Sequence, residues 1–234
     1  MPPNLPRRPD QPRRPTPSPR EDIESFLRAA GPPPARRGRL LFALDATMSR
    51  QPTWDMACSV QADMFDAAAA VGGLSVRLAY FRGIDEARAS RWVEDPTALA
   101  GLMTRIACVG GRTQIGRMLT LAERDATAPG GLGALVYVGD CMEEEAGALI
   151  DKAARLALHG VPAFMFHEGR DPVAARTFRE IAAVSGGVYR RFDSAAAASL
   201  RALLEAAAIY AVGGRPALEA HGGAAARAML ADLR

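Results

Sequence analysis

The chain has 234 residues, of which 49% are hydrophobic and 6% aromatic, and its formal net charge is +3. This length suits one domain with a tail, because a domain usually holds ~100–200 residues. The charge is uneven, since residues 1–39 hold nine arginines against four acidic residues and residues 40–234 therefore carry 3 − 5 = −2. The basic character belongs to the tail, so we expect no nucleic-acid binding by the folded part.

Cysteine usage and hydropathy are typical of a cytoplasmic protein. The three cysteines, Cys58, Cys108 and Cys141, are odd in number and widely separated, which favours reduced thiols over a disulfide framework or a zinc site. The sequence has no apolar run of about 18 residues, and no apolar stretch follows the basic N-terminal residues. We therefore expect a cytoplasmic protein that is neither inserted into a membrane nor bound to one.

Residues 1–37 are predicted to be a disordered tail rich in proline and arginine. Residues 1–20 hold eight prolines and five arginines, with too little apolar surface to offset the entropy of ordering, so polyproline II character is expected. A short amphipathic helix is predicted near 21–30. A docking arm for a proline-recognising domain or an acidic surface is the alternative to a solvated tail.

Strands and helices are predicted to alternate from residue 38 onward, which indicates an α/β domain with a mostly parallel sheet covered on both faces. The segment 87–93 is the predicted antiparallel edge strand, protected by its arginines. A C-terminal extension at 213–234 is predicted to be partly helical. The other predicted strands are 40–44, 74–81, 134–138, 161–166 and 187–192, and the predicted helices are 53–71, 96–109, 117–126, 143–159, 172–184 and 195–212.

Oxygen-bearing side chains follow three of these elements. Asp45, Thr47 and Ser49 come directly after the first strand, Thr113 lies in a glycine-rich loop at 110–116, and Asp140 follows the strand at 134–138. If those two strands are neighbours where the strand order reverses, the three loops meet in one crevice. Carboxylate and hydroxyl oxygens suit Mg²⁺ or Mn²⁺, whereas zinc and copper favour histidine and cysteine.

The three motifs resemble those of the von Willebrand factor type A domain and its metal-ion-dependent adhesion site. The residues DATMS at 45–49 are similar to the family's Asp-x-Ser-x-Ser. The residues TQIGRML at 113–119 are similar to Thr-x-x-Gly-x-x-Leu, and VGDC at 138–141 is similar to a hydrophobic-Thr-Asp-Gly motif, with cysteine in place of the usual glycine. The resemblance covers about residues 38–212.

The resemblance implies a Rossmann-like, doubly wound fold with one antiparallel edge strand and a non-enzymatic role in protein–protein interaction. It implies Thr47, Ser49 and Thr113 as direct ligands of Mg²⁺ or Mn²⁺, with Asp45 and Asp140 direct or acting through water. A partner's Asp or Glu would complete the coordination. Cytoplasmic members of the family often work with ATPases or chaperone systems, which by analogy suggests the kind of partner.

Two alternatives to a metal site follow from the same residues. The hydroxyls of Thr47, Ser49 and Thr113 and the carboxylate of Asp140 are each suited to capping the helix that follows. Asp45 at the end of a buried strand also resembles the nucleophile of a haloacid-dehalogenase-type phosphatase. That chemistry needs a second acid two residues on, and position 47 is threonine.

Two further side chains stand near the predicted site. His167 ends a predicted strand, and we expect it to be a solvated loop residue rather than part of the site. Trp54 follows the first metal loop and is suited either to a contact surface or to the core.

Overall fold

The computed structural model describes residues 38–192 and 197–233. The predictions for the tail at 1–37 and for the helix near 21–30 lie outside the described residues. The described part contains one six-stranded sheet. Its strands are β1 (Gly38–Asp45), β2 (Leu74–Arg82), β3 (Glu86–Val93), β4 (Ala134–Gly139), β5 (Ala163–Glu168) and β6 (Tyr189–Phe192).

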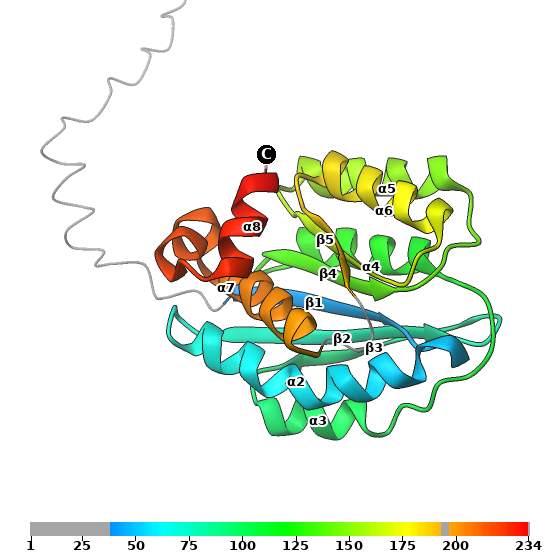
Figure 1. Cartoon of the computed structure of the whole chain (residues 1–234), viewed down its shortest axis with the longest axis horizontal. Helices are drawn as coiled ribbons and strands as arrows, with labels where there is room; N and C mark the ends of the chain where they lie inside the picture. The colour runs from blue at the N-terminus through cyan, green and yellow to red at the C-terminus, as the bar shows by residue number, and fades with distance from the viewer. Residues whose placement is uncertain (1–37, 193–196, 234) are drawn as a thin grey trace, which may run out of the picture. The chain divides into compact units, whose positions relative to one another are not determined.

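The helices connect the strands and cover both faces of the sheet (Figure 1). They begin and end close to their predicted positions in most cases. They are η1 (Met48–Arg50), α2 (Gln51–Ala69), α3 (Pro96–Met103), α4 (Ile115–Thr127), α5 (Ala146–Leu158), α6 (Pro172–Ser185), α7 (Ala197–His221) and α8 (Ala224–Asp232).

The strand order is β3-β2-β1-β4-β5-β6, and every neighbouring pair is parallel except β2 and β3. The predicted antiparallel edge strand and the doubly wound α/β class are therefore confirmed. The chain runs outward from β1 through β2 to β3, then returns to the other side of β1 with β4. The carboxyl ends of β1 and β4 thus flank the point where the order reverses, which is where such sheets bind ligands.

The core has two halves, one on each face of the sheet. Alternate residues of a strand point to opposite faces, so Leu40 and Phe42 pack with α2, α3 and α7, whereas Leu41 and Ala43 pack with α4, α5 and α6. Trp54 belongs to the first half: it is 3% exposed and its Nε1 donates a hydrogen bond to the Met103 carbonyl at 3.1 Å. Of the two roles open to Trp54, the core role is the observed one.

Helix α3 ends at Met103, so the prediction that it reaches residue 109 is wrong. The backbone of Val109 is bonded elsewhere: its N–H donates to the Ala46 carbonyl at 3.0 Å, and its carbonyl accepts from the Gly83 N–H at 3.4 Å. A helix that ended at Val109 would have used this N–H in an internal hydrogen bond to the carbonyl of Arg105. The chain instead crosses the carboxyl ends of β1 and β2 on its way to Thr113.

Helix α5 begins at Ala146, three residues later than predicted. Its N-cap is Glu145, whose carboxylate accepts hydrogen bonds from the N–H groups of Gly147 and Ala148. Glu143 and Glu144 lie in the loop before the helix, where they bond to another part of the chain.

The C-terminal residues complete the cover of one face of the sheet. Helix α7 continues to His221 across a kink at Gly214, which has φ 63° and ψ −158° and lies two residues before Pro216. Leu218 and Met229 are fully buried in the same core cluster as Leu40. Among the helices that the structure describes, none is long and apolar enough to cross a membrane.

Arg77 of β2 forms an ion pair with Asp125 of α4, which links that helix to the sheet. The side chains of Arg77 and Asp125 are 18% and 4% exposed. We expect Asp125→Ala to lower the free energy of unfolding by about 2–3 kcal/mol, because it leaves a largely buried guanidinium without its carboxylate. Urea denaturation followed by circular dichroism measures this. Asp66→Ala removes an exposed carboxylate of α2 and should change the value by less than about 0.5 kcal/mol; equal effects of the two substitutions would contradict the prediction.

Candidate metal centre

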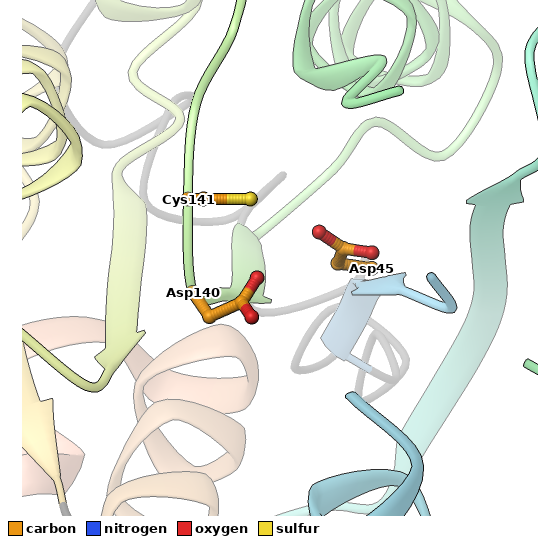
Figure 2. Close-up of side chains that lie close together, drawn as sticks. All are labelled: Asp45, Asp140 and Cys141. Atoms are coloured by element: carbon orange, nitrogen blue, oxygen red, sulfur yellow. The ribbon is translucent and has the colours of Figure 1, made fainter. Parts of the chain in front are cut away.

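Asp45 and Asp140 meet at the reversal point of the sheet. Asp45 is the last residue of β1 and is 1% exposed, and Asp140 directly follows β4, the strand beside β1. One carboxylate oxygen of each lies within 4.8 Å of the other and of the Cys141 sulfur. Figure 2 shows the Asp140 carboxylate directed toward Asp45. The structure therefore brings together the two carboxylates that the sequence predicted to converge.

Thr47 and Ser49 form a compact turn behind Asp45. The Thr47 N–H donates to Asp45 Oδ1 at 2.8 Å, which fixes the orientation of the carboxylate. The hydroxyls of Thr47 and Ser49 share a hydrogen bond at 3.3 Å. Thr47 is 6% exposed, whereas Ser49 is exposed. The two predicted hydroxyl ligands therefore lie side by side.

Thr113 is tied to the loop after β4 by a reciprocal pair of hydrogen bonds. Its N–H donates to Glu143 Oε2 at 3.1 Å, and its hydroxyl oxygen accepts from the Glu143 N–H at 2.9 Å. The alternative in which Thr113 and Asp140 cap the helices that follow them is wrong, because the N-caps of α4 and α5 are Gln114 and Glu145. Thr113 is instead held beside the segment that carries Asp140.

Glu144 caps helix α4 from outside. Its two carboxylate oxygens accept hydrogen bonds from the N–H groups of Ile115 at 2.6 Å and Gly116 at 2.8 Å. These N–H groups have no partner within the helix, and the positive end of the helix dipole favours a carboxylate there. Glu143 and Glu144 thus join the loop after β4 to the start of α4, although the sequence predicted them in the first turn of their own helix.

The glycine-rich loop is held against the end of β2. A Cβ on Gly111 would lie 1.9 Å from the Gly83 carbonyl oxygen, so this position tolerates glycine alone. The Arg112 N–H donates to the same carbonyl at 2.9 Å. The Gln114 side-chain amide adds hydrogen bonds to backbone carbonyls that include those of Arg82 and Gly83. These contacts fix the path of the chain into Thr113.

His167 is fully buried on β5, so the prediction of a solvated loop histidine is wrong. Its Nε2 lies 3.1 Å from the Asp140 carbonyl oxygen, which can only accept, so Nε2 carries the proton and Nδ1 accepts from the Tyr189 hydroxyl at 2.9 Å. Burial lowers the pKa of His167, which favours this neutral imidazole. His167 therefore supports the backbone of Asp140 and has no nitrogen left for a metal.

Cys141, the cysteine of the third motif, lies with the two carboxylates although the sequence did not predict it as a site residue. It is a free thiol, as is the buried Cys108; the side chain of Cys58 lies outside the description. Burial, and after it the charge of the adjacent Asp140 carboxylate, together raise the pKa of Cys141 to about 12. At neutral pH the sulfur is therefore a protonated thiol, which is a poor metal ligand.

The donor set fits a hard divalent cation. Asp140 Oδ1 is buried and has no hydrogen-bond partner among the described residues, and the nearby donors are carboxylate and hydroxyl oxygens. Such oxygens are preferred by Mg²⁺ and Mn²⁺. Beside Asp140 the protein is hollowed into a cleft of about 400 Å³. The cleft is lined by Ser49, Asp140, Glu168, Gly169, Arg170, Arg191 and Phe192.

The hydrogen bonds of Glu144 predict that its substitution changes both the stability of the protein and its Mg²⁺ affinity. We expect Glu144→Gln to lower the free energy of unfolding by about 1 kcal/mol through the lost charge at the α4 N-terminus, and to weaken any Mg²⁺ binding that involves Thr113. Thermal unfolding and calorimetric Mg²⁺ titration measure the two effects. Glu145→Gln is the matched control, since it alters the cap of α5 without touching the Thr113 loop; a similar loss of Mg²⁺ affinity in both variants would contradict the assignment.

The raised pKa of Cys141 predicts slow alkylation. With the pKa at about 12, the thiolate fraction at pH 8 is about 10³-fold below that of an ordinary thiol. In a Cys58→Ser, Cys108→Ser background, iodoacetamide should react with the folded protein about 10³-fold more slowly than with the urea-unfolded protein, and the rate should rise with pH up to about pH 12. Mass spectrometry measures the rates. Comparable rates in the folded and unfolded protein would be inconsistent with a protonated, shielded thiol.

No family model and no curated protein sequence matches the chain. Solved structures do resemble it. A von Willebrand factor type A protein from Catenulispora acidiphila gives a TM-score of 0.58 at 20% identity, over 74% of this chain and 43% of that chain. An aerotolerance-related membrane protein from Bacteroides fragilis gives 0.56 at 18% identity, over 73% and 98%. BatB from Bacteroides thetaiotaomicron gives 0.55 at 20% identity, over 70% and 95%.

The chain spans less than half of the first of these proteins and nearly all of the other two. At such identities the likeness concerns the fold and does not extend to the ligands of the site. The likeness agrees with the strand order, the antiparallel edge and the helices on both faces. The chain has the fold of von Willebrand factor type A domains.

Proposed function

We propose that this chain is a non-enzymatic, divalent-metal-dependent module for binding another protein. Mg²⁺ or Mn²⁺ is held by Asp45, Thr47, Ser49, Thr113 and Asp140, and an Asp or Glu of the partner takes a remaining coordination position. The observation that carries the proposal is the approach of the Asp45 and Asp140 carboxylates to within 4.8 Å at the reversal point of the sheet. The fold supports it, because type A domains generally serve interaction and not catalysis.

Electrostatics favours a cation at this place. Two carboxylates at this distance repel each other by about 3–4 kcal/mol at an effective dielectric constant of about 20. Asp45 is almost fully buried, so solvent screens the repulsion only in part. A divalent ion between the two oxygens replaces this repulsion with two attractions.

The coordination number of the ion leaves a position for an incoming carboxylate. Two carboxylates neutralise a divalent ion, and hydroxyls add oxygen ligands without adding charge. Mg²⁺ requires about six oxygens in octahedral geometry and keeps water where the protein supplies none. Exchange of such a water for a partner's carboxylate gives a charge-assisted contact that a neutral side chain cannot match.

The phosphatase alternative lacks support from the residues around Asp45. Position 47 is threonine, and its N–H binds Asp45 Oδ1, so no acid stands two residues beyond the candidate nucleophile. The association with an ATPase or chaperone system and the cytoplasmic location stay predictions.

The first test is calorimetric titration of Mg²⁺ into the whole chain. Thr113→Val and Asp140→Ala should each weaken binding at least about tenfold, because each removes an oxygen ligand. Thr113→Ser keeps the hydroxyl and should bind as the wild type does. At a Mg²⁺ concentration of about 100 times the dissociation constant, the ion should add about 2.7 kcal/mol to the free energy of unfolding.

Two results would count against the metal site. One is equal Mg²⁺ binding by the wild type and an Asp140→Ala, Thr113→Val double variant. The other is a loss of Mg²⁺ affinity in Asp66→Ala as large as in Asp140→Ala. Asp66→Ala removes an exposed carboxylate far from these loops in sequence. Hydrolysis of p-nitrophenyl phosphate that disappears in Asp45→Asn would favour the phosphatase instead.

A further inference from the structure

The cleft beside Asp140 extends from the candidate metal site to the ends of two further strands. Ser49 and Asp140 belong to the metal site and also line the cleft, so the two spaces are continuous. The opposite wall comes from the end of β5 and the loop after it, with Glu168 and Arg170, and from β6, with Arg191. The volume of about 400 Å³ lies within the ~300–1,000 Å³ range of ligand pockets.

The two arginines of the cleft are exposed. Neither Arg170 nor Arg191 forms an ion pair with any residue that the structure describes. Arg190, the next residue along β6, differs: it forms an ion pair with Asp232 and donates to the Ala228 carbonyl. Neighbouring residues of a strand point to opposite sides. Strand β6 therefore directs the guanidinium of Arg190 to α8 and that of Arg191 to the cleft.

The cleft carries a surplus of positive charge when the metal site is filled. Arg170 and Arg191 contribute +2 and Glu168 contributes −1, which gives 2 − 1 = +1, while Asp140 is offset by the cation. Guanidinium groups bind carboxylates through two parallel hydrogen bonds. Glu168 is 9% exposed, so its carboxylate lies in the cleft wall, whereas the two guanidinium groups are exposed.

We propose that this cleft is a second acidic subsite, in which Arg170 and Arg191 bind a second Asp or Glu of the protein partner beside the one that reaches the metal. The inference rests on the proposed metal-dependent function. The partner segment carries two acidic residues at positions i and i+2, because in an extended chain these side chains project to the same side. A long polyanion such as nucleic acid fits less well, since Glu168 lies in the cleft wall and residues 40–234 carry a net charge of −2.

Three synthetic peptides test the subsite with the whole chain in the presence of Mg²⁺. The first carries one Asp in a Gly/Ser background, the second carries Asp at i and i+2, and the third carries two Asp residues too far apart to share the cleft. Fluorescence anisotropy should show the second peptide binding about fivefold more tightly than the first, the gain expected from a partly exposed ion pair. The third has the same charge as the second and should bind like the first.

Variants assign the preference to the arginines. Arg170→Ala with Arg191→Ala should abolish the preference for the second peptide and leave the Mg²⁺ affinity, titrated without peptide, unchanged. Arg176→Ala removes an exposed guanidinium of α6 outside the cleft and should keep the preference. The preference should also shrink as salt is raised.

The outcomes separate this inference from the function on which it rests. Three results would overturn the acidic subsite while Mg²⁺ binding stays normal. They are equal affinity for the three peptides, no binding of any peptide, and an unchanged preference in the Arg170→Ala, Arg191→Ala variant. Each of them leaves the metal site standing. Absence of Mg²⁺ binding by the wild type overturns both.

Discussion

The reversal of strand order between β1 and β4 is the constraint on which the site depends. The chain leaves β1 toward one edge of the sheet and leaves β4 toward the other, so the carboxyl ends of these two strands lie side by side where the connections diverge. Each strand end carries an aspartate, and the two carboxylates approach within 4.8 Å. Asp45 is almost fully buried, so this arrangement of two carboxylates is unfavourable by itself, and the proposed cation would offset the repulsion.

Long-range hydrogen bonds, and not local helix signals, place the third loop of the site. Glu143 exchanges two hydrogen bonds with Thr113, and Glu144 satisfies the first N–H groups of α4. One pair of neighbouring acids thereby holds the Thr113 hydroxyl against the loop after β4 and offsets the positive end of helix α4. His167 holds the Asp140 carbonyl from the other side. The candidate ligands are therefore positioned by backbone contacts that need no metal, which lowers the entropy lost on binding an ion.

The sequence predicted the sheet well because strands buried on both faces appear as continuous apolar runs, as at 40–44 and 134–138. It failed where a distant backbone group decides the local structure. Val109 leaves the helix because Ala46 and Gly83 bind its backbone. An acid is favoured near a helix N-terminus. The predicted position of Glu143, in the first turn of its own helix, satisfies this preference, and so does its observed position beside Thr113. Only the contact between the Thr113 loop and the segment after β4 distinguishes these two arrangements, and no motif records it. The convergence of Asp45 and Asp140 was predictable because topology alone requires it.

Arg170 and Arg191 escaped sequence analysis for a related reason: they follow strands without any spacing that marks a site. In the proposed interaction, their place in the cleft beside Asp140 gives them a role that the metal cannot supply. A metal ion binds any carboxylate that reaches it, so it supplies affinity without distinguishing one acidic partner from another. Discrimination has to come from groups beyond the ion, and a cleft with two exposed guanidinium groups and one carboxylate favours a particular arrangement of charge. The buried ends of β1 and β4 would then provide the bond to the partner, and the outer strands β5 and β6 would determine which partner can form it.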